Sequence, residues 1–164
     1  MRVRLHPRIR LSDLLSETRI LAESAPIPGR RAVLRLAELM VRDGAIRNPL
    51  GFYNEALNQE KSAVIVPKPE GDRPCSFRVY QVCSPAVGRL SAALGLSPKG
   101  FPFEDGTAEL LLLLASPTRT LPACLAAMNR ALQIVRHPRR AERILSCIRP
   151  EEVLALVREF DRRT

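Results

Sequence analysis

Apolar residues recur along the chain with two different periods, and the two periods predict a mixture of helices and strands. Over residues 30–43 the apolar positions have helical spacing. Asn48 followed by Pro49 is the pattern of an N-cap and a first helical residue, so we expect a second helix to begin there. After Pro117 the apolar stripes return to helical spacing, which predicts that the rest of the chain is helical.

Shorter apolar segments between these helices are predicted to be strands. They cover residues 18–22, 63–66, 77–82, 90–96 and 110–115, with turns expected at 97–100 and 104–106. The run Leu110–Ala115 is unbroken by any polar residue, a pattern typical of a central strand covered on both faces. Strands interleaved with helices predict a layered α/β domain with a sheet between helices.

Length and composition bound the class of protein. The chain has 164 residues, of which 46% are hydrophobic, and this size suits one domain spanning 1–164. We expect residues 1–10, which are rich in Arg, to form a flexible N-terminal arm. The longest apolar run is six residues long, too short to span a membrane, and no signal-peptide pattern is present. A cytoplasmic protein is therefore expected.

The charge and the cysteines add little to this picture. The formal net charge is +9, but the basic residues are spread along the chain and acidic residues are interleaved with them. This pattern favours a solvated surface over a face that reads nucleic acid. The four cysteines form no CxxC pair, and neither histidine lies at ligand spacing from a cysteine. We therefore expect no metal site, and no cofactor is predicted.

Three segments of the chain resemble segments of one known protein family, and they occur in the same order. Residues 90–119 resemble its strand, its "S-x-x-G-I-x-F" turn, its short Gly loop and its apolar strand with a closing Pro. Residues 125–161 resemble its three closing helices, and residues 30–60 resemble its first two helices. The family is the enzyme IIA domain of the fructose, mannitol and nitrogen-regulatory type, from the bacterial phosphotransferase system. The resemblance covers nearly the whole chain.

The resemblance implies both a fold and an activity. It implies an α/β/α sandwich with a mixed, mostly parallel sheet. It also implies a histidine that accepts a phosphoryl group from a small carrier protein and passes it to a sugar-transport partner. A neutral imidazole nitrogen suits that role because the pKa of free histidine is about 6.5.

The sequence departs from the family at the positions that carry this chemistry. In the alignment by motif, Lys68 stands where the acceptor histidine follows the family's strand, and Leu121 lies where a second histidine opens the next helix. Gln59 replaces the family's arginine, and the Gly-rich loop is missing. A lysine ammonium has a pKa of about 10.4 and no free lone pair at neutral pH. We therefore predict a degenerate site without a catalytic residue.

Three functional hypotheses follow. The favoured one is an IIA-like domain that is not an enzyme and acts as a regulatory or protein-binding module. The alternatives are an active phosphocarrier with a relocated acceptor, His6 or His137, and a binder of anionic partners or nucleic acid through the Arg-rich surface. A smaller hypothesis is that Lys68, with Arg73 or Arg119, forms a cationic depression that holds an anion.

The segment 73–89 is longer than the family's usual connection. It could add an edge strand or a pairing surface over residues 77–82, or it could be an ordinary insertion packed on the domain, which we favour. We expect a protein partner for the domain. The oligomeric state does not follow from the sequence.

Overall fold

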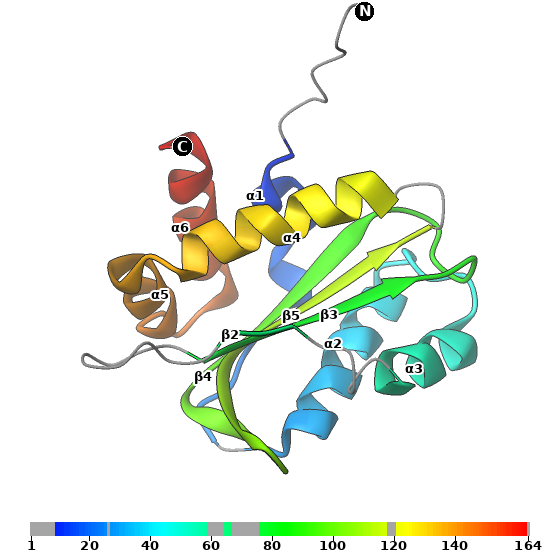
Figure 1. Ribbon diagram of the computed structural model, residues 1–164, viewed down its shortest axis with the longest axis horizontal. Helices are drawn as coiled ribbons and strands as arrows, with labels where there is room; N and C mark the ends of the chain where they lie inside the picture. The colour runs from blue at the N-terminus through cyan, green and yellow to red at the C-terminus, as the bar shows by residue number, and fades with distance from the viewer. Residues whose placement is uncertain (1–8, 26, 59–63, 67–75, 118–120, 164) are drawn as a thin grey trace, which may run out of the picture.

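The computed structural model describes residues 9–25, 27–58, 64–66, 76–117 and 121–163. Within them the chain forms a five-stranded sheet in the order β1-β4-β5-β3-β2 (Figure 1). The strands are β1 Ile20–Ala22, β2 Val64–Val66, β3 Phe77–Cys83, β4 Ser91–Phe103 and β5 Gly106–Ser116. β1 pairs with β4 and β3 pairs with β5 in parallel, whereas β4–β5 and β2–β3 are antiparallel.

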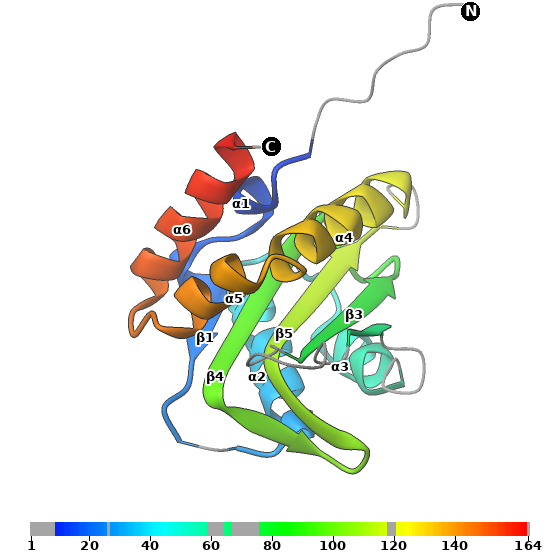
Figure 2. The same cartoon turned by 60° about the vertical axis from the view of Figure 1, so that its left-hand side comes forward.

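Helices cover both faces of this sheet. They are α1 Leu11–Leu14, α2 Gly29–Arg42, α3 Pro49–Asn58, α4 Leu121–Val135, α5 Pro138–Leu145 and α6 Pro150–Arg162, with the 3-10 turn η1 at Glu17–Arg19. α2 and α3 pack on one face, and α4, α5 and α6 lie on the other (Figures 1 and 2). The predicted α/β/α sandwich with a mixed sheet is confirmed. No helix in the described part of the chain is long and apolar enough to cross a membrane.

β5 is the central strand, as its unbroken apolar run predicts. Side chains of a strand alternate between the two faces of the sheet. Leu110, Leu112 and Leu114 accordingly join the core under α4, α5 and α6. Leu111 and Leu113 join the core under α2 and α3. Because both faces are covered, every residue of this run must be apolar.

The boundaries of α2 and α3 follow from their local sequence. α2 begins at Gly29 and ends at Arg42, close to the predicted 30–43. α3 begins at Pro49, and the Asn48 side-chain oxygen accepts a hydrogen bond from the Gly51 amide at 3.1 Å. This bond satisfies one of the amides that a helix N-terminus leaves without a partner.

The structure corrects one of the two predicted turns. Residues 97–100 are not a turn: β4 continues through them to Phe103, and the β4–β5 register shifts between Leu96 and Phe101. Gly100 has φ +86°, a backbone conformation that glycine adopts without strain. The predicted turn at 104–106 is confirmed, since it joins β4 to β5.

The hypothesis of an edge strand at 77–82 is wrong. β3 lies between β5 and β2, and Phe77, Val79, Tyr80 and Val82 are all about 1% exposed. The edge strand on this side is the short β2. Interior strands are buried on both faces, which is why this segment carries so many large apolar residues.

Candidate functional site at the carboxyl end of the sheet

Two parallel strands and one helix meet at one end of the sheet. The last residue of β3, Cys83, is in register with the last residue of β5, Ser116. The Ser84 amide continues this pairing by donating to the Ser116 carbonyl at 3.0 Å. α4 begins soon afterwards, at Leu121, so the ends of β3 and β5 point toward the start of α4 (Figure 1).

A group of thiols and hydroxyls fills this meeting point. The Cys83 Sγ lies 3.2 Å from the Ser116 Oγ, and the Gln81 amide nitrogen donates to the same sulfur at 3.5 Å. Cys124, in the first turn of α4, is fully buried. Burial raises the pKa of the Cys124 thiol to about 11, against the opposing effect of a hydrogen bond with Ser116. This thiol is therefore protonated and unreactive at neutral pH.

Ser84 is held by a second set of bonds. Its hydroxyl donates to Glu55 Oε1 of α3 at 2.9 Å and accepts from the Ala86 amide at 3.1 Å. Its carbonyl accepts from the Val87 amide at 3.1 Å. Only 2% of Ser84 is exposed, so its hydroxyl is committed to stabilising the turn after β3.

The groups available here are hydroxyls, thiols and one carboxylate that are already hydrogen-bonded within the fold or buried. Transfer of a phosphoryl group needs an accessible nucleophile and cationic or donor groups around the phosphoryl oxygens. The described cluster offers hydroxyls that are already bonded, one deeply buried thiol, and the carboxylate of Glu55. Among the described residues no group of three or more His, Cys, Asp or Glu could hold a metal ion.

Most of the predicted site residues fall outside the described part of the chain. Lys68, Gln59, Arg73 and Arg119 are among these undescribed residues, and so is His6. Leu121 begins α4, but its side chain is not described. The hypothesis of a cationic depression at Lys68 therefore stays a prediction.

The described residues closest in sequence to Lys68 and to Leu121 lie far apart in the fold. Val66, at the end of β2, pairs with Phe77, and Phe77 pairs with Leu110 near the start of the parallel stretch of β5. The six steps from Leu110 to Ser116 span about 20 Å at about 3.3 Å per residue. The end of β2 and the start of α4 therefore lie at opposite ends of the sheet, so these neighbours give no support to one cleft shared by Lys68 and Leu121.

His137 is the histidine that the structure describes. It is exposed and occupies the N-cap position of α5, without a side-chain capping bond. The 15 residues of α4 separate it from the cluster. At a rise of about 1.5 Å per residue, α4 is about 22 Å long. His137 is therefore not part of the cluster around Ser116.

Acidic partners are interspersed with arginines over the described surface. Arg42 pairs with Glu38 at 2.9 Å, and Arg143 pairs with Glu159 at 3.2 Å. Deeper in the fold, Arg130 pairs at 2.9 Å with Asp161, which also accepts from the Ser12 amide. This mixture of signs favours a solvated surface over a single cationic face.

Sequence reasoning missed the cluster at the end of β3. Cys83, Ser84 and Ser116 have no motif in common, and their partners are Glu55 in α3 and Cys124 in α4. The signal that could have found them is the step from a buried strand to Ser84-Pro85, matched by the step from β5 to Ser116-Pro117. That signal becomes visible only when β3 and β5 are known to be parallel neighbours.

Comparison with known proteins identifies solved structures that share this architecture. No family model matches the sequence, and no curated protein matches it. Among solved structures, PtxA from Streptococcus mutans, assigned to PTS IIA, is 21% identical, with a TM-score of 0.72 over 94% of this chain and 96% of that one. The nitrogen regulatory protein IIA-Ntr from Neisseria meningitidis is 16% identical, with a TM-score of 0.70 over 90% and 98%.

A third similar structure contains a protein partner. It is the complex of enzyme IIA mannitol with phosphorylated enzyme IIB mannitol from Escherichia coli, at 20% identity and a TM-score of 0.62, over 88% of this chain and 97% of that one. Identities this low speak for the fold alone. The chain has the fold of the phosphotransferase system IIA proteins, as its sequence motifs indicate.

Proposed function

We propose that this protein is an IIA-like domain that does not carry phosphoryl groups and acts as a regulatory or protein-binding module. The observation that supports it most is the cluster at the carboxyl ends of β3 and β5. The resemblance implies that the acceptor strand and the helix after the apolar strand bring two histidines to one place. β3 is the strand that ends beside β5 and α4, and it is followed by Ser84.

The register of β3 bears on which residue stands at the family's acceptor position. We assign that position to Ser84 instead of Lys68, because β2 is antiparallel to β3 and ends at the other end of the sheet. Attack by Ser84 would need its hydroxyl to face an incoming phosphoryl group, yet the residue is 2% exposed. The Glu55 carboxylate at 2.9 Å would also repel a phosphoryl dianion.

A protein partner and a reducing compartment belong to the same proposal. The Escherichia coli IIA mannitol structure is a complex with a IIB protein, which supports a protein partner for this chain. Leu125 of α4, next to Cys124 in the sequence, is 45% exposed and offers an apolar contact near the cluster. Cys83, Cys124 and Cys147 are free thiols, as expected in the cytoplasm.

Phosphorylation with purified components tests the proposal. The protein is incubated with phosphoenolpyruvate, the first enzyme of the system and its carrier protein, beside an active IIA mannitol domain as positive control. We expect no acid-labile phosphate on this chain. Stable labelling would contradict the proposal, and its loss in His137→Ala or His6→Ala would establish the relocated-acceptor alternative.

A further inference from the structure

Two cysteines from distant parts of the sequence face each other at the carboxyl end of β3. Cys83 is the last residue of β3, and Cys124 is in the first turn of α4. Alternate residues of a strand face the same side of the sheet. Phe77 and Val79 belong to the core under α4, α5 and α6, so Cys83 faces that side too. Cys124 belongs to the same core.

Both thiols contact the same two polar side chains. The Cys83 Sγ lies 3.2 Å from the Ser116 Oγ and accepts a hydrogen bond from the Gln81 amide nitrogen at 3.5 Å. Cys124 also forms hydrogen bonds with Ser116 and Gln81, and it forms a further one with Cys83 itself. Contact of this kind gives each thiol a high effective concentration at the other, which favours a reaction between them.

The two thiols differ in their access to solvent. Cys83 is half-buried, whereas Cys124 is fully buried, so a small oxidant from solution meets Cys83 first. Burial raises the pKa of the Cys124 thiol to about 11, and the neighbouring Cys83 adds to this effect. Cys124 alone therefore stays reduced, and only an activated partner in contact with it brings it into reaction.

We propose that a hydroperoxide oxidises Cys83 and that Cys124 then closes an internal disulfide with it. In the first step the Cys83 sulfur attacks one peroxide oxygen, so that an S–O bond forms and the O–O bond breaks. The departing oxygen takes the thiol proton and leaves as water or as an alcohol, and Cys83 becomes a sulfenic acid.

The second step takes place within the fold. The Cys124 sulfur attacks the Cys83 sulfur, an S–S bond forms, and the S–O bond breaks. The departing hydroxide takes the Cys124 proton and leaves as water. The two cysteines together lose two electrons, which the peroxide gains.

The disulfide would join β3 to α4. Cys124 follows Cys83 by 41 residues, and a bond that closes a long loop restricts the unfolded chain and thereby stabilises the fold. The internal hydrogen bonds of the cluster exclude an incoming phosphoryl group, but a reaction between two of its members does not require one. Oxidation of this pair therefore does not depend on the proposed function.

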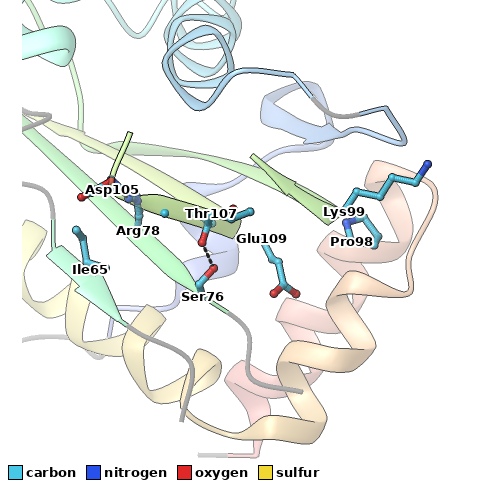
Figure 3. Close-up of a pocket in the computed structure, with 10 residues that line it drawn as sticks. Ile65, Ser76, Arg78, Pro98, Lys99, Asp105, Thr107 and Glu109 are labelled. Atoms are coloured by element: carbon cyan, nitrogen blue, oxygen red, sulfur yellow. Dashed lines mark hydrogen bonds and ion pairs between the residues drawn. The ribbon is translucent and has the colours of Figure 1, made fainter. Parts of the chain in front are cut away.

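The two remaining cysteines serve as controls. Cys147 is half-buried like Cys83, but its thiol donates to the Arg143 carbonyl of α5 at 3.4 Å. Cys75 lies outside the described residues. Figure 3 shows its sequence neighbour Ser76 among the residues that line a cavity at the amino end of β3. β3 spans about 20 Å at about 3.3 Å per residue, so we expect no bond between Cys83 and Cys75.

Peptide mapping of the full chain tests the proposal. The reduced protein is treated with hydrogen peroxide, its remaining thiols are alkylated, and it is then unfolded and digested with trypsin. Arg78, Arg89 and Arg130 separate the four cysteines, so each cysteine is carried by its own peptide. We expect the Cys83 and Cys124 peptides to be joined, and a thiol reductant to separate them again.

Variants separate the two steps. In Cys124→Ala, Cys83 should stop at the sulfenic acid, which dimedone traps, whereas the wild type should take up little dimedone. Cys83→Ser should leave Cys124 reduced at the same peroxide concentration. Cys147→Ser and Cys75→Ser are the matched controls, and each should form the disulfide as the wild type does.

Circular dichroism reports the folding of each variant, and mapping of the wild type keeps the test decisive where Cys124→Ala fails to fold. The peroxide concentration is raised until the half-buried Cys147 is oxidised. Cys83 and Cys124 both still reduced at that point would overturn the proposal. Cys83 joined to Cys75, to Cys147 or to a second copy of the chain would contradict it equally.

Discussion

The two ends of β3 bury polar groups in opposite ways. At its carboxyl end, the chain itself supplies the hydrogen-bond partners of Cys83, Ser84 and Ser116. At its amino end, Arg78 is a buried cation whose single described partner, Asp105, lies on an exposed turn. One end is satisfied within the core, while the buried charge at the other end pairs with a carboxylate of an exposed turn.

This difference separates a closed site from an open one. Small neutral groups can be buried without loss when every donor and acceptor is paired within the fold. A buried charge needs a counter-charge, and a partner from an exposed turn can be shared with an anion from solution. The end of β3 beside α4 is therefore chemically closed, whereas the buried charge at the other end has its described partner at the surface.

The ion pair at the open end should respond unequally to removal of its two partners. Asp105→Asn should lower the free energy of unfolding, because it leaves buried Arg78 without a carboxylate. Arg78→Met should cost less, since Asp105 is then simply solvated. Urea denaturation measures both, with Glu38→Gln in the exposed pair with Arg42 as control at below about 0.5 kcal/mol. Equal losses in the two variants would contradict this asymmetry.

At the closed end, the buried Ser116 hydroxyl should contribute more to the free energy of unfolding than an exposed hydroxyl does. Ser116→Ala should lower the free energy of unfolding by about 1–2 kcal/mol, because the fully buried hydroxyl bonds to Cys83. Ser146→Ala is the matched control, since the exposed Ser146 hydroxyl donates to the Arg143 carbonyl at 2.7 Å. Urea denaturation compares the two, and a Ser116→Ala loss no larger than the control would show that the cluster is not stabilising.

The closed end should lose stability in alkali. The pKa of Cys124 is raised by burial from 9.0 to about 11, so the folded state holds its proton more tightly than the unfolded chain. Its contribution is complete below pH 9 and is lost as the pH rises from 9 toward 11. Denaturant midpoints across this range should fall in the wild type and fall less in Cys124→Ala. Parallel curves for the two proteins would refute the assignment.

Acid should weaken the ion pair at the open end, and the resulting loss of stability should be the smallest of the expected effects. Hydrogen bonding by Arg78 lowers the pKa of Asp105 from 3.8, so the contribution of this pair is present above that pH and is lost as the pH falls below it. In Asp105→Asn the decline of the denaturant midpoint below pH 4 should be shallower. A decline remains, because the pKa values of Asp43 and Glu159 are also lowered. An unchanged slope would argue against the pair.

The local pattern was sufficient for the helices and for the central strand. The helical period over 30–43 and the Asn48-Pro49 start predict α2 and α3 to within a residue or two. The apolar run Leu110–Ala115 predicts a strand buried on both faces, and it is β5. These features depend on neighbouring residues, so the sequence contains the information directly.

The position of β3 could not be predicted in the same way. Its alternation allows an edge strand as well as an interior one, and the choice depends on pairing with Leu110–Ser116, which lies 33 residues further along. The misread turn at 97–100 has a similar cause. Pro98 and Gly100 are ordinary turn residues, yet pairing with β5 carries β4 past them.

The candidate sites depend on such long-range contacts even more strongly. Ser84 reaches Glu55, which is 29 residues away, and Arg78 reaches Asp105, which is 27 residues away. Neither pair has a motif, because each partner comes from a different element. Sequence alignment by motif therefore points to Lys68, whereas the position that we propose, Ser84, rests on the pairing of β3 with β5.

By itself, the sequence determined the layered α/β architecture, the helices and the central strand. Only the tertiary structure decided which strand ends beside α4 and which arginine is buried against a carboxylate of the β4–β5 turn. The physical reason is that periodicity and capping act within a few residues, whereas strand order and the burial of a charge are settled by contacts between distant segments.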